Sequence, residues 1–268
     1  HLDVYGDSSS FTDGFRQYAM KIDPNGVCVV KEGISLPTLC PSISYGIESD
    51  TVDYNASKLS YVDGEMQFFV DTKSSGRVPF KLGLPGIHNV SNALACIALL
   101  DHIGLPMSDI QRGLASFKGV KRRFEVQIKT SELVYIDDYA HHPEELKSLI
   151  DSLRMMYPEQ EINAVFQPHL YSRTRDFGNA FSEQLSRFDS LIILPIYPAR
   201  EPEIIGISSD WLLSMVNMKN KKVLSATDVL QAMKQKTKGV IVTIGAGDIG
   251  EIVAPLKDIL IQNIEAAS

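Results

Sequence analysis

The chain has 268 residues, of which 44% are hydrophobic and 22% are charged. These proportions are typical of a globular protein and exclude an intrinsically disordered chain. The formal net charge of −7 excludes a broad nucleic-acid-binding surface, since phosphate binding needs a concentrated basic face.

Membrane insertion and secretion are also not expected. The longest apolar run, residues 93–100, is too short to cross a bilayer, and residues 1–10 lack the basic and apolar stretches of a secretory signal. The three cysteines, Cys28, Cys40 and Cys96, are odd in number and widely spaced. We therefore predict a reduced, cytoplasmic protein that has neither nucleic acid nor membrane as a partner.

The first part of the chain predicts irregular α+β structure. Short β-like runs at 27–31 and 66–71 are separated by Gly, Pro and Ser residues. A helix is predicted from about Asn89 to His102, where apolar residues recur at helical spacing, and Gly104 follows as a stop signal. A second helix is predicted over 109–117.

From about Val126 the pattern changes. Five short apolar runs, each followed by a helical segment, begin near residues 133, 162, 190, 221 and 239. This alternation predicts an α/β fold with a Rossmann-like, mostly parallel sheet and helices on both faces. The domain boundary is placed at 124–127, which divides the chain into residues 1–125 and 126–268.

Two of the predicted strand ends carry dense polar clusters, and ligands of open parallel sheets gather at such ends. The first cluster, IDDYAHHPEE at 136–145, contains Asp137, Asp138, Tyr139, His141 and His142. Pro143 and the two glutamates that follow suit the first turn of a helix. Adjacent histidines point apart, so a metal site here is disfavoured. A polar loop without function remains an alternative.

The second cluster, FQPHLYSRTRD at 166–176, places His169 just past a strand, with two arginines near the following helix start. An arginine in that position suits a carboxylate or a phosphate. Arg175 alone would be read as ordinary surface charge, and a surface role is the alternative for Arg173 too.

Three further motifs are less specific. GVKRRFE at 119–125 either clamps an anion or forms a solvated basic face. GAGDIG at 245–250 has the spacing of a dinucleotide fingerprint, but no second strand follows, so we expect only a tight strand-to-helix turn. Asn89 and Asn92 share a helix face and could read a base edge, although Asn89 could instead be a helix cap. No phosphate-binding loop of the form G-x-x-x-x-G-K-[ST] is present.

Taken in order, seven segments resemble the Mur ligases and, within that family, its alanine-adding branch. They are HLDVY (1–5), GIHNVSNALA (86–95), GVKRRFE, DDYAHHPEE (137–145), FQPHLYSRTRDF (166–177), IYPAREPEIIG (196–206) and GAGDIG. The resemblance implies that residues 1–125 are the C-terminal part of the central, ATP-binding α/β domain. Residues 126–268 would be the C-terminal Rossmann-like domain, and the phosphate loop would lie upstream of His1.

The resemblance also implies a reaction. ATP, with Mg²⁺, would phosphorylate the lactyl carboxylate of UDP-N-acetylmuramate, and the amine of L-alanine would attack the acyl phosphate. Such chemistry needs cations around the phosphoryl group and a firmly placed carboxylate. The chain alone, without the phosphate loop, is expected to be inactive. Two alternatives stay open: a murein-recycling ligase that attaches a tripeptide to the same sugar nucleotide, and a non-catalytic nucleotide-binding or interaction module.

The same resemblance assigns roles by position. His1 matches a metal-ligand histidine, which makes a tag remnant a poorer explanation of the first residue. Leu170 stands where some members of the family carry a second arginine, which puts one carboxylate contact in doubt. The positions matched to ATP binding are Asn89, Asn92, Arg123 and Asp138. Those matched to the reacting carboxylate or phosphate are Tyr139, His141, His169 and Arg173, of which the last three are the predicted catalytic residues.

Overall fold

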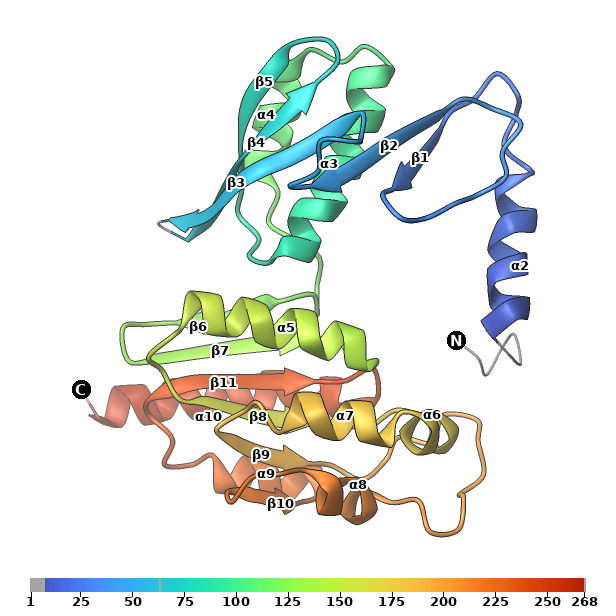
Figure 1. The fold of residues 1–268 in the computed structure, drawn as a ribbon. Coiled ribbons are helices and arrows are strands. Elements are labelled where there is room, and N and C mark those ends of the chain that lie inside the picture. Colours follow the sequence, from blue (N-terminus) through green and yellow to red (C-terminus); the bar gives the residue numbers. More distant parts are fainter. Residues whose placement is uncertain (1–7, 63, 268) are drawn as a thin grey trace. The chain divides into compact units, whose positions relative to one another are not determined.

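The computed structural model describes residues 8–62 and 64–267 and divides the chain into two compact units, 1–118 and 119–268 (Figure 1). The first unit contains α2 (Ser8–Ala19), β1 (Cys28–Lys31), β2 (Ser42–Ile47), β3 (Tyr54–Val62), β4 (Glu65–Thr72), β5 (Gly76–Leu82), α3 (Ile87–His102) and α4 (Met107–Ser116). Its strands form one sheet in the order β1-β2-β3-β4-β5, parallel from β1 to β3 and antiparallel from β3 to β5.

Helix α3 supplies the apolar cover of this first sheet. Its buried face, which includes Val90, Leu94 and Ile97, packs with buried strand residues such as Phe68 and Phe80 in one core. The predicted helix is thereby confirmed, but it begins two residues earlier, at Ile87, directly after Gly86 (φ 97°). Gly104, with φ 83°, takes the left-handed conformation expected of a helix stop.

The second unit carries the helix–strand alternation. Its elements are β6 (Glu125–Lys129), β7 (Leu133–Asp138), α5 (Pro143–Met156), β8 (Ile162–Phe166), α6 (Tyr171–Asp176), α7 (Gly178–Leu185), β9 (Ser190–Ile193), α8 (Ser209–Met215), β10 (Lys221–Val223), α9 (Ala226–Ala232), β11 (Gly239–Ile244), η1 (Asp248–Ile252) and α10 (Val253–Ala267). All five predicted strands are present. The edge strand β6, antiparallel to β7, was not predicted.

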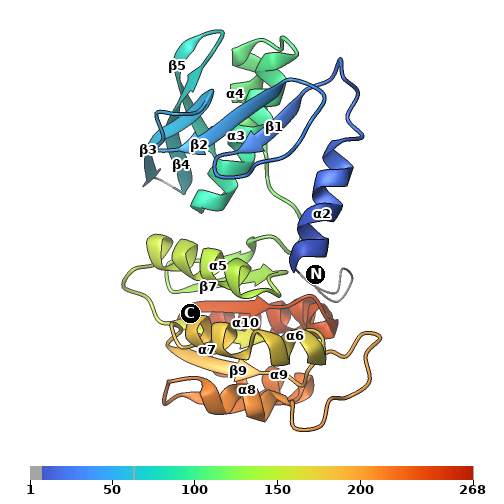
Figure 2. The same cartoon turned by 45° about the vertical axis from the view of Figure 1, so that its right-hand side comes forward.

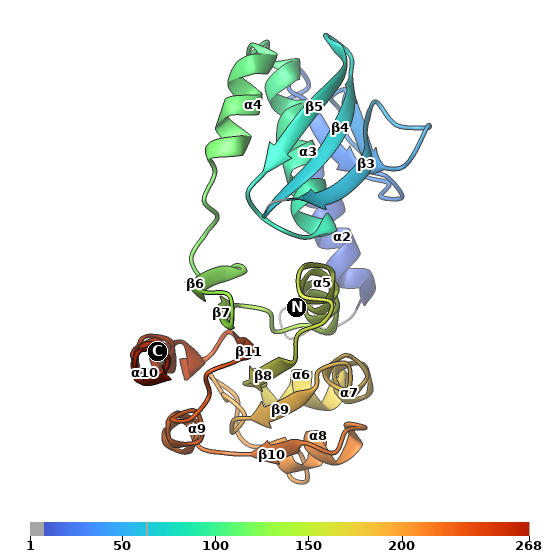
Figure 3. The same ribbon diagram turned by 90° about the vertical axis from the view of Figure 1, so that its left-hand side faces the viewer.

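Helices cover both faces of the second sheet, as Figure 3 shows edge-on. Every residue of β7 and β8 is buried, which accounts for their continuous apolar runs. One face packs against α5, α7 and α8, for example through Leu149, Phe181 and Leu212. The other packs against α9 and α10 through Val229 and Leu256. The predicted mostly parallel sheet with two helical layers is confirmed.

The strand order of this sheet is β10-β9-β8-β11-β7-β6, so the last strand in sequence lies between β7 and β8. Strands β7, β8 and β11 are parallel to one another. Their carboxyl ends therefore emerge side by side at one edge of the sheet, which we call the carboxyl edge, and it is visible in Figure 2. The segments after these three strands are the two polar clusters and the GAGDIG turn.

Candidate active site

Backbone and side-chain hydrogen bonds tie the three strand ends of the carboxyl edge together. The Gly245 N–H donates to the carbonyl of Asp138 at 3.0 Å, and the Gln167 N–H donates to the carbonyl of Ile244 at 2.9 Å. The Gln167 side chain donates to the Asp248 carboxylate and accepts from the Ile249 N–H at 2.9 Å. The clusters that the sequence places far apart are thus one continuous surface.

The GAGDIG turn is built for close approach. A Cβ on Gly247 would lie 2.5 Å from Oε1 of Gln167 and 2.6 Å from Cγ of Tyr197, and Gly245 has φ 148°. Within the described residues, the turn leads into the short η1 and then α10. The interpretation of this motif as a tight turn is therefore confirmed.

Arg122 turns inward and fastens the 119–125 segment to the carboxyl edge. Its guanidinium donates through Nε to Asp137 at 3.1 Å and through Nη2 to the carbonyl of Gly245 at 2.6 Å. It also lies over the ring of Tyr139, 5.0 Å from the centroid. Arg122 is therefore neither part of an anion clamp nor part of a solvated face, the two alternatives that the sequence left open.

Arg123, the predicted nucleotide-binding arginine, is turned the other way. Its side chain is 56% exposed and lies 4.0 Å from Glu145. The guanidinium sits 5.7 Å from the centroid of the Tyr139 ring, so this ring contacts both arginines. Arg123 thus presents a cation at the edge of the cluster, where an anionic ligand could reach it.

The two aspartates at the end of β7 are buried and hydrogen-bonded. Asp137 accepts from Arg122 and from the hydroxyl of Thr243 at 2.7 Å, and burial raises its pKa. Asp138 accepts backbone N–H bonds from Phe124 at 2.7 Å and from Ala140 at 2.8 Å. Burial nevertheless raises the pKa of Asp138 to about 6, since desolvation outweighs these two hydrogen bonds.

Three of the predicted substrate-facing side chains form a chain of contacts. The Tyr139 ring lies 5.4 Å from His141, and the His141 ring lies 6.0 Å from His169. Nδ1 of His141 is 2.9 Å from the carbonyl of Tyr139 and 3.3 Å from Glu145. A carboxylate and a carbonyl thus fix the orientation of this imidazole, as expected of a group that must meet a ligand in one geometry.

Arg173 completes this chain of contacts. It comes from α6, is buried, and places Nη1 3.4 Å from Nδ1 of His169. The surface alternative for Arg173 is therefore wrong, because only 7% of the residue is exposed. Arg175, two positions on, is exposed and paired with Asp176 at 2.7 Å, as predicted for ordinary surface charge.

The adjacent histidines do not converge on a common point. His142 caps α5, accepts from the Glu144 N–H at 3.4 Å and packs on Phe177, with ring centroids 4.8 Å apart. Pro143 and the two glutamates occupy the first turn of α5, as predicted. Within residues 8–62 and 64–267, no group of three His, Cys, Asp or Glu side chains could hold a metal ion. The predicted metal ligand His1 lies outside the described residues.

Asn89 and Asn92 lie on α3 in the first unit. The side-chain amide of Asn89 donates to the carbonyl of Pro85 at 2.7 Å. Gly86 is the residue that precedes α3, so the helix-cap alternative for Asn89 is wrong. Asn92 is exposed on this apolar helix, one turn further on. The pair is thus placed on one helix face with the second amide open to a ligand.

Leu170 has an unusual backbone. Its φ is 69° and its side chain is buried, while its N–H donates to the carbonyl of Tyr197 at 2.9 Å. The carbonyl of Leu170 accepts from the Thr174 hydroxyl at 2.8 Å. The backbone of Leu170 therefore anchors the start of α6, while its apolar side chain cannot supply a polar contact to a ligand.

Sequence reasoning missed four residues that hold this edge together: Arg122, Gln167, Tyr197 and Glu201. Tyr197 stacks on His169 with centroids 5.5 Å apart, and Glu201 accepts from the N–H of Ser172 at 2.9 Å and from its hydroxyl. Their segments are among those that resemble the Mur ligases, but no sequence motif predicts that an arginine turns inward or that a ring after one strand stacks on a ring after another.

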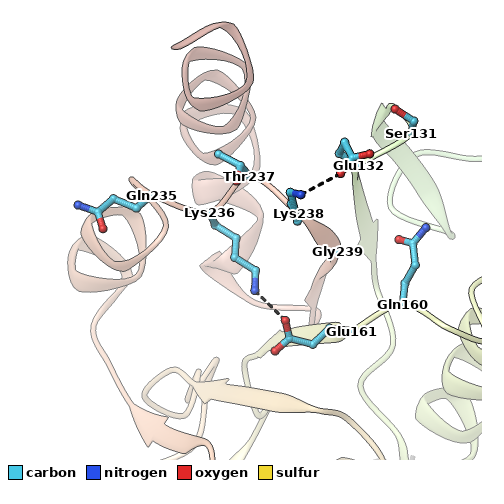
Figure 4. Close-up of a pocket in the computed structure, with 9 residues that line it drawn as sticks. All are labelled: Ser131, Glu132, Gln160, Glu161, Gln235, Lys236, Thr237, Lys238 and Gly239. Carbon is cyan, nitrogen blue, oxygen red and sulfur yellow. Dashed lines mark hydrogen bonds and ion pairs between the residues drawn. The ribbon is translucent and has the colours of Figure 1, made fainter. Parts of the chain in front are cut away.

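A separate hollow of about 470 Å³ lies at the opposite, amino edge of the same sheet (Figure 4). Its lysines are paired with glutamates: Lys236 with Glu161 at 3.1 Å and Lys238 with Glu132 at 3.4 Å. None of the predicted site residues lines it. Among the described helices, none has the length and apolarity needed to span a membrane.

Comparison with known proteins places this arrangement in a family. The description "Mur ligase middle domain" matches residues 1–100, and "Mur ligase, glutamate ligase domain" matches residues 122–250. The chain belongs to the Mur ligase family. Both matches fall inside the divisions suggested by the two compact units.

Curated relatives agree. The chain is 44% identical to the UDP-N-acetylmuramate–L-alanine ligase of Flavobacterium psychrophilum, with 96% of the chain and 56% of that protein covered. It is 42% identical to the enzyme of the same name from Flavobacterium johnsoniae, with 98% of the chain and 58% of that protein covered. The chain therefore spans little more than half the length of these relatives.

Solved structures share the fold. The UDP-N-acetylmuramate-alanine ligase MurC of Thermotoga maritima matches with a TM-score of 0.75 at 24% identity, over 100% of this chain and 58% of that one. The MurF ligase of Thermotoga maritima, solved in complex with ADP, matches with a TM-score of 0.72 at 16% identity, over 100% of this chain and 60% of that one.

Proposed function

We propose that this chain is part of an ATP-dependent ligase that joins L-alanine to the lactyl carboxylate of UDP-N-acetylmuramate in peptidoglycan precursor synthesis. The observation that carries the proposal is the contact of half-buried His169 with buried Arg173, beside His141 and Tyr139, in a chain with 44% identity to a ligase of that name. The enzyme would act in the cytoplasm, where its nucleotide substrates are made.

The chemistry follows from the charges at the carboxyl edge. The Arg173 guanidinium would hold the muramyl carboxylate or the acyl phosphate through charge-assisted hydrogen bonds. His169 and His141, whose rings lie 6.0 Å apart, would orient that group, and one of them would accept the proton that the amine nitrogen loses as it attacks and phosphate leaves. Tyr139, whose ring contacts Arg122 and Arg123, would line the substrate position. Stabilising the negative charge that develops on oxygen is the contribution expected of such a cluster.

ATP is the proposed nucleotide of the complete enzyme, and its contacts are assigned residue by residue. Asn89 and Asn92 would read the adenine edge, and Arg123 and Asp138 would contact the rest of the nucleotide. Asp138 already accepts two backbone N–H bonds, but each carboxylate oxygen can accept a second bond. The complex of a related ligase with ADP supports a nucleotide site in this fold.

Mg²⁺ is proposed as a second cofactor of the complete enzyme. The ion would neutralise phosphate charge during transfer. Of this chain, only His1 is assigned to it, and the described residues hold no further ligand group.

The two domains are proposed as residues 1–125, the C-terminal part of the ATP-binding domain, and 126–268, the C-terminal domain. The compact units divide at residue 118, seven residues earlier than this proposal (125 − 118), because Arg122 and Phe124 bond to the second sheet. Limited proteolysis should cut first between 118 and 130 and leave a resistant C-terminal piece. A first cut inside 160–200 would count against this division.

The activity is tested with the full-length product of the gene that encodes this chain. Phosphate release from ATP should require both UDP-N-acetylmuramate and L-alanine, while the 268-residue chain alone should stay at background. Release only with a tripeptide in place of L-alanine would instead identify the recycling ligase. Nucleotide binding without any release would identify a non-catalytic module.

A further inference from the structure

The segment 197–201, between β9 and α8, runs along the His169–Arg173 pair. Its backbone pairs with the segment after β8: the Tyr197 N–H donates to the carbonyl of Pro168 at 2.9 Å, and the Leu170 N–H donates to the carbonyl of Tyr197 at 2.9 Å. An isolated parallel bridge joins His169 to Tyr197. The segment is thus attached to the residues that present His169.

The ring of Tyr197 is held from two sides. It stacks on His169 with an interplanar angle of 27°. On another side it lies against the backbone of Gly247, where an added Cβ would come within 2.6 Å of the ring. A ring confined in this way keeps the imidazole of His169 in one orientation, the one in which Nδ1 is 3.4 Å from the Arg173 guanidinium.

The other end of the segment holds the helix that carries Arg173. The carboxylate of Glu201 accepts from the Ser172 N–H at 2.9 Å and from its hydroxyl, within the first turn of α6. A charged acceptor on a first-turn N–H is the stronger class of hydrogen bond and fixes the helix start. Tyr197 and Glu201 therefore act on His169 and on the backbone beside Arg173, respectively.

We propose that residues 197–201 are a positioning strap for the His169–Arg173 pair, with Tyr197 and Glu201 as its two attachment points. The inference rests on the proposed ligase function for its kinetic consequence. The contacts of Tyr197 and Glu201 described above are with His169, Gly247 and Ser172, none of which is assigned to the nucleotide. Loss of the strap should therefore lower kcat and leave the KM for ATP unchanged. Positioning contributes to the rate because a displaced guanidinium loses more of its interaction with the transition state than of its interaction with the bound substrate.

The test uses four variants of the full-length product. Tyr197→Leu removes the ring that stacks on His169. Tyr197→Phe is the conservative variant, which keeps a ring and should therefore keep the activity. Glu201→Gln removes the negative charge, so the charge-assisted hydrogen bonds to Ser172 become weaker neutral ones. Asp176→Asn neutralises an exposed carboxylate on the same helix and serves as the matched control.

Kinetics and NMR are measured together. Tyr197→Leu and Glu201→Gln should each lower kcat roughly ten-fold with the KM for ATP within two-fold, while Tyr197→Phe restores and Asp176→Asn keeps the wild-type value. In labelled protein, the Nε–Hε signal of Arg173 should shift or broaden in the first two variants only. Melting temperatures show whether each variant is folded. If Tyr197→Leu is not folded, the result for Glu201→Gln decides whether the strap positions the pair.

The outcomes separate the two levels of the proposal. An inactive wild-type enzyme would remove the proposed function, while the Arg173 signal would still report on the strap. Wild-type kcat together with an unchanged Arg173 signal in both Tyr197→Leu and Glu201→Gln would overturn the strap itself.

Discussion

The two edges of the second sheet are made of the same strands but differ in chemistry. At the carboxyl edge, the buried side chains of Asp137, Asp138 and Arg173 each have a hydrogen-bond partner, and Gly247 allows close approach of the backbone to neighbouring side chains. At the amino edge, Lys236 and Lys238 form surface ion pairs around an open hollow (Figure 4). Buried charge is costly and persists only where geometry compensates it, whereas surface pairs contribute little.

The predicted site residues gather at the carboxyl edge, and none of them lines the hollow. Strand order decides where ligands gather, since β11 inserts between β7 and β8 and brings three loops to one edge. The amino edge receives only the short segments that enter these strands.

The largest effect is expected for Arg173→Lys at the carboxyl edge. Lysine keeps the charge but cannot form the forked pair of hydrogen bonds to a carboxylate or phosphate. We expect kcat/KM for UDP-N-acetylmuramate to fall roughly ten- to a thousand-fold, about 1.4–4 kcal/mol. Steady-state kinetics on the full-length product measure this, and Arg175→Lys on the same helix is the control. A near-wild-type value for Arg173→Lys would refute the assignment of this arginine.

The second effect concerns pH. Burial raises the pKa of Asp138 to about 6 from its ordinary 3.8. Because the pKa of Asp138 is higher in the folded than in the unfolded state, this group stabilises the folded state fully at pH values below its unfolded pKa. That stabilisation is lost as the pH rises through the folded pKa of about 6. The second unit should thus lose about 3 kcal/mol of unfolding free energy from this group between pH 4 and 7. Urea unfolding at several pH values measures the slope, and Asp138→Asn should flatten it. Equal slopes in both proteins would contradict the buried state.

A pair of glycines compares the two edges directly. A Cβ would clash with Gln167 and Tyr197 at Gly247, and with the carbonyl of Glu161, 2.9 Å away, at Gly239. Substitution by alanine should cost about 1–3 kcal/mol of stability at either position. Only Gly247→Ala should also lower kcat at temperatures where both variants are folded. Equal kcat values in the two variants would show that the turn at the carboxyl edge is merely structural.

The smallest effect is expected at the amino edge. Lys238 is 78% exposed and its pair with Glu132 spans 3.4 Å. Lys238→Met should change the unfolding free energy by less than about 1 kcal/mol and leave kcat/KM within two-fold. Denaturation and steady-state assays check both. A large loss of activity would mean that this edge binds a substrate.

Much of the fold could be predicted because its signals are local. The runs that became β7, β8 and β11 are mostly apolar, since both faces of these strands are covered. The edge strand β6, with mixed burial, carries no such run and was missed. Apolar residues at helical spacing predict a start of α3 at about Asn89, but the helix begins at Ile87, directly after the N-cap residue Gly86.

The site could be predicted only in part. The polar residues after β7 and β8 were found because they follow strands. Arg122 resembles its basic neighbours in sequence, and its inward direction depends on a left-handed backbone (φ 58°) and on a carbonyl 123 residues away, that of Gly245. Tyr197 and Glu201 act through pairings 28 and 29 residues apart in sequence (197 − 169 and 201 − 172). Such non-local contacts leave no periodic signal.

Hydrogen exchange measured by mass spectrometry tests the central claim most directly, because it reports where substrates bind. The full-length product is compared alone and with UDP-N-acetylmuramate and a non-hydrolysable ATP analogue. We predict slower exchange in peptides that cover 138–142, 167–173 and 245–250, and no change in those that cover 131–132 and 235–239. Protection confined to the peptides of the amino edge would contradict the account.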